Sequence, residues 1–197
     1  MPKNFAIVFF WTICTASLSL GAEAARSARW LLPAPELQAD PQIPTLKKVA
    51  GHEWARDITS HTEMERYLQA LVKAAPDRTA LVPYGRTYEG RTLYYLVIAK
   101  PENLQRREAV RAANLQLADP RRTPPEKARE LIARNPALVW LAFGIHGNET
   151  SSTEAALLTA YHLLADRRPE TRRLLDDAVV LIDPLQNPDG HERFVNV

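Results

Sequence analysis

The sequence predicts an α/β fold with a mixed, mostly parallel sheet and helices on both of its faces. Two continuous apolar runs, residues 137–143 and 178–182, have the composition of strands that are buried on both sides. Residues 152–166 and 170–177 are expected to be helices, so that strands and helices alternate along this part of the chain. The composition agrees, because 46% hydrophobic and 24% charged residues are typical of a globular domain.

The first 24 residues have the three parts of a cleaved export signal. Lys3 gives a positively charged start, residues 5–20 form a largely apolar run of sixteen, and residues 22–24 (Ala-Glu-Ala) match the pattern that signal peptidase cuts. Sixteen residues is short for a membrane span, and no basic stop-transfer cluster follows closely. We therefore expect a secreted or periplasmic protein with no stable membrane anchor after cleavage. Its mature form would contain no disulfide, because the only cysteine is Cys14.

Residues 25–55 form a proline-rich extension without a clear period, either strapped along the domain or serving as a loose linker. The domain is expected to occupy residues 56–197. Its first helix begins at a capping box, for which Thr62 and Glu65 have the right spacing, and ends at Pro76.

A hairpin is expected next, with strands near residues 80–84 and 92–99 joined by the segment 85–91. The second of these strands is apolar enough to be buried on both faces. Helices are then expected at residues 102–118 and 125–134, the second of which begins after the consecutive prolines that commonly open a helix.

His146 and Glu149 form an H-x-x-E pair directly after the apolar strand 137–143. In α/β sheets, ligand sites gather at the carboxyl ends of the strands. An imidazole and a carboxylate three residues apart on a tight turn can face the same ion, and zinc accepts such nitrogen and oxygen ligands. Gly144 and Gly147 would allow the sharp bend. From the residues alone, the alternative of a capped turn with a hydrogen-bonded histidine stays equally open.

Three motifs in order extend this argument: residues 84–91 (YGRTYEGR), 144–149 (GIHGNE) and 187–190 (NPDG). Together they resemble the zinc carboxypeptidase family, in a match that runs from about residue 58 to residue 197. The resemblance implies that His146 and Glu149 are the first two ligands of a Zn²⁺ ion. It also implies peptide or protein C-termini as substrates, and a zinc-activated water with a glutamate as its base.

The sequence departs from the family pattern in two respects. Asn148 stands where digestive members carry an arginine that contacts substrate. The family's third ligand, its substrate-carboxylate arginine and its catalytic glutamate are expected beyond Val197. We therefore expect an incomplete catalytic domain, truncated at its C-terminus, with no catalytic residue within this chain.

Other polar residues near the motifs receive smaller roles. Arg193 follows the NPDG turn closely enough to be a candidate for substrate binding. Asp189 is expected to shape its turn, because Pro-Asp-Gly is turn chemistry. We expect His162 to be a partly buried helix residue rather than a ligand, and His191 to lie on the surface.

Two alternatives to an exported metallocarboxypeptidase are considered. The N-acyl amino acid deacylases of the same fold share a similar H-G-N-E stretch, but they begin close to it and lack the hairpin at residues 85–91. A non-catalytic binding module would keep the fold without the chemistry. A nucleic-acid partner is not expected, because the net charge is only +2 and the arginine pairs are dispersed along the chain.

If the export signal is cut after Ala24, the mature protein begins at Ala25. N-terminal sequencing of exported protein should therefore start there. Recovery of intact Met1 from the exported fraction would contradict the prediction.

Overall fold

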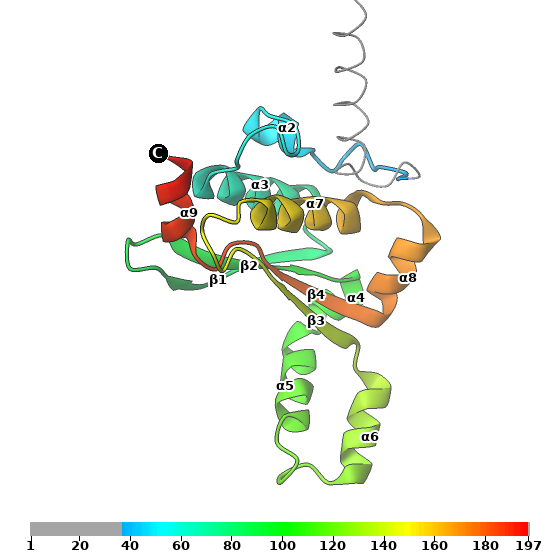
Figure 1. Cartoon of the computed structure of the whole chain (residues 1–197). Helices are drawn as coiled ribbons and strands as arrows, with labels where there is room; N and C mark the ends of the chain where they lie inside the picture. The colour runs from blue at the N-terminus through cyan, green and yellow to red at the C-terminus, as the bar shows by residue number, and fades with distance from the viewer. Residues whose placement is uncertain (1–36, 197) are drawn as a thin grey trace, which may run out of the picture. The chain divides into compact units, whose positions relative to one another are not determined.

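A four-stranded mixed sheet organises residues 37–196, the part of the chain that the computed structural model describes (Figure 1). The predicted export signal lies outside these residues. The spatial order of the strands is β1-β2-β4-β3. Their bounds are β1 Thr79–Arg86, β2 Thr92–Ile98, β3 Ala137–Ala142 and β4 Ala178–Asp183.

The directions of the strands bring three carboxyl ends to one edge of the sheet. β2 is antiparallel to both β1 and β4, whereas β3 is parallel to β4. β1, β3 and β4 therefore run the same way. The predicted mixed sheet is confirmed, but within the described residues antiparallel pairing predominates. The antiparallel pairs arise because β2 returns through a hairpin and pairs with β4 on its other side.

Helices α3 (His61–Ala74) and α7 (Ser151–Ala165) cover one face of the sheet (Figure 1). Residues three, four and seven apart on each helix point into the same core, as an amphipathic helix requires. The largest fully buried side chains of this core are Leu46, Met64, Tyr67, Leu68, Leu71, Leu96, Ile98, Leu157, Leu164 and Ile182.

The first helix of the domain is capped two residues earlier than expected. Ser60 is the N-cap of α3: its hydroxyl accepts from the Glu63 backbone N–H, and the Glu63 carboxylate accepts from the Ser60 backbone N–H. The predicted pair, Thr62 and Glu65, has the same spacing but lies inside the helix. The spacing alone could not choose between two overlapping pairs.

The segment before α3 packs against the domain. Helix α2 (Leu46–Ala50) contributes Leu46 to the core, and Ile43 and Trp54 are also buried. The Trp54 ring meets the Tyr67 ring edge-on, with centroids 5.7 Å apart. Residues 37–55 therefore lie along the domain instead of forming a loose linker.

The remaining helices of residues 37–196 are α4 (Pro101–Gln105), α5 (Arg107–Leu117), α6 (Pro125–Arg134), α8 (Pro169–Asp177) and α9 (Pro188–Val195). The single helix expected at 102–118 is divided at Arg106, which ends α4 and begins α5. Arg106 donates to Asn103 and to the Arg134 carbonyl, so its side chain joins α4 to the end of α6.

The second face of the sheet is only partly covered. Leu104 of α4 packs on Val97 and Val179. Side chains of α5 and of the strands line an apolar groove of about 470 Å³ on this face. Leu138 and Trp140 of β3 are 47% and 64% exposed. β3 is an edge strand within the described sheet, so its outer backbone groups have no strand partner there.

An exposed apolar edge strand promotes association between chains. Residues 25–197 expressed alone should therefore self-associate and melt over a broad range. Trp140→Lys should shift the protein towards monomer in light scattering, because a charge on the edge opposes strand pairing. Leu174→Lys, at an exposed position on α8, is the matched control and should not. A sharp melt from a soluble monomer of the unchanged sequence would contradict the prediction.

Candidate metal site

His146 and Glu149 lie together on the loop between β3 and α7. The loop leaves β3 through Gly144, whose φ of +65° favours glycine. The Glu149 N–H donates to the His146 carbonyl at 3.1 Å and closes a tight turn. On this turn, His146 Nδ1 lies 3.2 Å from Glu149 Oε1, and both side chains are mostly exposed.

This separation suits two ligands of one zinc ion. Ligand atoms each about 2.1 Å from a tetrahedral zinc are about 3.4 Å apart. The pair could therefore hold Zn²⁺ without a large rearrangement of its turn. Among residues 37–196, however, no cluster of three or more histidine, cysteine or acidic side chains could complete a metal site.

The two loops that follow β3 and β4 are joined by backbone hydrogen bonds. Phe143 N–H donates to the Asp183 carbonyl at 2.9 Å, and Gln186 N–H donates back to the Phe143 carbonyl at 3.0 Å. Asn187 N–H then donates to the Gly144 carbonyl at 2.9 Å. These bonds continue the β3–β4 pairing beyond the strands and end two residues before His146.

Gly147 fixes the contact between the GIHGNE and NPDG turns. A Cβ on Gly147 would lie 2.1 Å from the Gly190 carbonyl carbon and 2.3 Å from the His191 nitrogen. No side chain fits at this position. The two motifs that are more than forty residues apart in the sequence therefore meet backbone to backbone.

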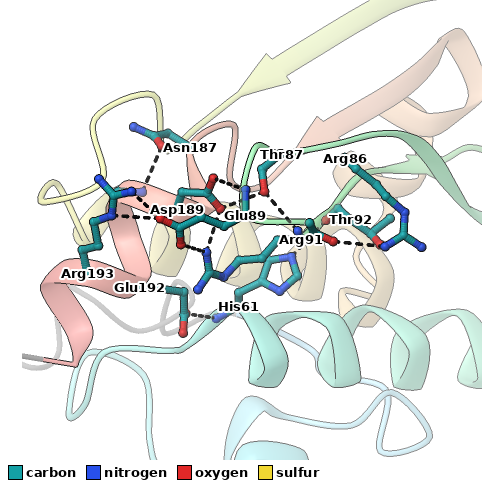
Figure 2. Close-up of polar contacts among 12 residues, drawn as sticks. His61, Arg86, Thr87, Glu89, Arg91, Thr92, Asn187, Asp189, Glu192 and Arg193 are labelled. Carbon is teal, nitrogen blue, oxygen red and sulfur yellow. Dashed lines mark hydrogen bonds and ion pairs between the residues drawn. The ribbon is translucent and has the colours of Figure 1, made fainter.

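The hairpin motif joins the same cluster through Asp189, as Figure 2 shows. Asp189 Oδ1 accepts from the Thr87 hydroxyl at 2.8 Å and from the Arg91 guanidinium at 2.7 Å. Asp189 Oδ2 accepts from the Glu89 N–H at 3.1 Å. The loop between β1 and β2 is thus clamped onto the first turn of α9.

Charges around Asp189 favour its ionised form. Burial opposes ionisation, but hydrogen bonds from Thr87 and Arg91 outweigh it and hold the pKa of Asp189 below its usual value. Hydrogen bonds from Arg91 and Arg193 likewise lower the pKa of Glu89. The cluster is therefore a network of paired charges that braces the turn, as expected of Asp189.

Arg193, the predicted substrate contact, lies on α9 and its guanidinium pairs with Glu89 (Figure 2). The structure thus brings Arg193 to the cluster but engages it with a carboxylate of the protein itself. Sequence patterns assigned no role to Arg91 or Glu89; the only indication was the Gly-Arg pair that ends the hairpin motif.

The expectation that His191 lies on the surface is wrong, whereas the expected partial burial of His162 on a helix is observed. His191 is 1% exposed, and its Nε2 lies 2.9 Å from the Thr59 carbonyl, because α9 packs against the start of α3. His162 is partly buried on α7, with its Nε2 3.3 Å from Asp166. Neither histidine belongs to the turn that carries His146.

A family model described as zinc carboxypeptidase matches residues 64–196. The chain belongs to the zinc carboxypeptidase family. Carboxypeptidase D of Mus musculus is 29% identical over 136 residues, covering 68% of this chain and 8% of that protein. Carboxypeptidase D of Homo sapiens is 28% identical over the same length and coverage.

Solved structures agree on the fold of this zinc carboxypeptidase chain. Thrombin activatable fibrinolysis inhibitor superposes with a TM-score of 0.53 at 16% identity, over 91% of this chain and 38% of that one. The chain therefore spans well under half the length of the relatives that it matches. Among residues 37–196, every helix is too short or too polar to span a lipid bilayer.

Asp189→Asn should weaken the clamp between the hairpin and α9. We expect a loss of about 1 to 2 kcal/mol at pH 7, because hydrogen bonds to a charged acceptor are replaced by weaker ones. The folded-state pKa of Asp189 is lowered from 3.8, so this stability is present above pH 3.8 and is lost as the pH falls through the folded-state pKa. The difference in free energy of unfolding between the unchanged protein and Asp189→Asn should therefore become smaller as the pH falls.

Urea denaturation of Asp189→Asn, made in the Trp140→Lys protein that is expected to be monomeric, would measure the loss of stability and its dependence on pH. The control is Glu126→Gln, which removes an acid from an exposed ion pair with Arg129 and should change little. Equal losses in Asp189→Asn and Glu126→Gln would contradict the clamp.

Proposed function

We propose that this chain is part of an exported zinc metallocarboxypeptidase, in which His146 and Glu149 supply the first two zinc ligands. The observation that carries the proposal is the 3.2 Å separation of His146 Nδ1 and Glu149 Oε1 at the carboxyl edge of the sheet. Membership of the zinc carboxypeptidase family supports this over the deacylase alternative. The substrates of the whole enzyme would be the C-termini of peptides or proteins.

In this proposal, the residues of the chain hold and orient rather than react. His146 presents the Nδ1 lone pair, Glu149 presents a carboxylate oxygen, and the close contact at Gly147 fixes the turn that carries both. When bound, zinc would lower the pKa of a coordinated water and polarise the scissile carbonyl. We place the third ligand, the base and the cation that binds the substrate carboxylate beyond Val197, from the family resemblance.

Arg193 stays a proposed substrate contact. Its guanidinium would first have to leave Glu89, since the two groups are paired in this structure. A substrate carboxylate could replace Glu89 as the partner of Arg193, because both carry the same charge and geometry.

Metal binding gives the first test. Two protein ligands are fewer than the three or four of a tight zinc site, so residues 25–197 should bind zinc weakly. His146→Ala should remove that binding in a competition titration with a chromogenic chelator. His162→Ala is the matched control and should bind as the unchanged chain does.

Activity gives the second part of the same test. Blocked dipeptides with several C-terminal residues should not be hydrolysed by residues 25–197 with added zinc, because no base is assigned there. A polypeptide extended beyond Val197 along its gene should hydrolyse these dipeptides, and its His146→Ala and Glu149→Ala variants should not. Turnover by residues 25–197 alone would contradict the proposal.

A further inference from the structure

Asp183 is a buried carboxyl at the carboxyl end of β4, outside the set of residues discussed as ligands. It is 1% exposed. Its Oδ2 accepts from the Tyr84 hydroxyl at 2.9 Å and from Gln186 Nε2 at 3.3 Å. Its Oδ1 is buried and has no hydrogen-bond partner among the described residues.

The strand pattern alone does not explain an acid at this position. Val179 and Leu181 precede Asp183 at alternate positions on β4, so all three side chains are on the same face. Burial raises the pKa of Asp183 more than the hydrogen bonds from Tyr84, Gln186 and the Leu185 backbone N–H lower it. A buried carboxyl with one unsatisfied oxygen costs stability, and an apolar residue would avoid that cost.

Asp183 sits where the two loops of the candidate site are joined. Its backbone carbonyl accepts from Phe143, the first residue after β3. Its side chain holds Gln186, whose backbone N–H donates to the Phe143 carbonyl at 3.0 Å. The next residue, Asn187, bonds to the carbonyls of Gly144 and Ile145. The Asp183 carboxyl thus folds the 183–187 turn against the backbone that leads to His146.

Tyr84 connects this carboxyl to the hairpin. It lies near the carboxyl end of β1, at the register shift between Pro83 and Gly85, and its ring packs on Tyr95 with centroids 5.9 Å apart. The hydroxyl of Tyr84 therefore links β1 to Asp183 at the end of β4. The Tyr84–Asp183 hydrogen bond reaches the 183–187 turn at its first residue, whereas the clamp at Asp189 lies just beyond its last residue.

We propose that Asp183, held by Tyr84, is a positioning residue that sets the His146 loop through the 183–187 turn. The consequence for metal binding rests on the proposed function of His146 and Glu149. To position the loop, residue 183 must supply a hydrogen-bond acceptor at the Oδ2 position, and it need not carry a negative charge. Asparagine can supply that acceptor, and alanine cannot.

The experiment uses the whole chain and four variants: Tyr84→Phe, Asp183→Ala, Asp183→Asn and Tyr94→Phe. Tyr94→Phe is the matched control, because it removes a tyrosine–carboxylate hydrogen bond to Glu65 away from the loop. Two readouts are needed. Amide hydrogen exchange at Gln186 and Asn187 reports the joined loops without metal, and the visible absorbance of added Co²⁺ reports metal binding at His146.

Tyr84→Phe and Asp183→Ala should speed exchange at both amides and weaken Co²⁺ binding by about 10-fold or more, as loss of an outer partner of a metal ligand does. Asp183→Asn and Tyr94→Phe should stay within about twofold of the unchanged chain. Tyr84→Phe removes one oxygen from a partly exposed residue, so it should fold even where Asp183→Ala does not.

Unchanged exchange in Tyr84→Phe would overturn the proposal, as would faster exchange with unchanged Co²⁺ binding. An Asp183→Asn protein as impaired as Asp183→Ala would also overturn it, because charge would then be the requirement. Absence of any His146-dependent Co²⁺ binding in the unchanged chain would contradict the proposed function instead. The exchange rates would then decide the positioning of the loop by themselves.

Discussion

The contact between Gly147 and Gly190 is the constraint on which the site depends. A Cβ at residue 147 would lie 2.1 Å from the Gly190 carbonyl carbon, so the GIHGNE and NPDG turns can touch only as bare backbone. That contact places the ligand turn beside the start of α9. Because β3 and β4 run in parallel, both turns begin at the same edge of the sheet, where the backbone bonds of Phe143 and Asn187 keep them in register.

The rest of the described structure supports this edge from two sides. The hairpin after β1 reaches the same edge and binds Asp189 through Thr87 and Arg91. Behind it, α9 is fixed to α3, since the Glu192 carboxylate accepts from the His61 N–H at 2.6 Å (Figure 2). Most of the stabilising burial lies under α3 and α7, away from the exposed pair at His146 and Glu149. The candidate site is therefore an exposed turn on a packed base, an arrangement that would leave room for water and substrate beside a bound metal.

Sequence patterns predicted what depends on local periodicity and missed what depends on long-range contact. The strands at 137–142 and 178–183 and the helix at 125–134 were predictable from apolar runs and proline. α9 was not, because Asn-Pro-Asp-Gly favours a turn, although Pro188 in fact opens a short helix capped by Asn187. His191 is buried against Thr59, and Arg91 pairs with Asp189. The residues of each contact are about a hundred or more positions apart, so no local sequence pattern predicts either contact.

The central claim is that His146 and Glu149 face one metal ion from a turn held by the sheet edge. Anomalous X-ray scattering at the zinc absorption edge, from crystals grown with Zn²⁺, tests it most directly. The account predicts one strong peak about 2.1 Å from both His146 Nδ1 and a Glu149 carboxylate oxygen. A peak beside His162 and Asp166 instead, with none at the turn, would contradict it.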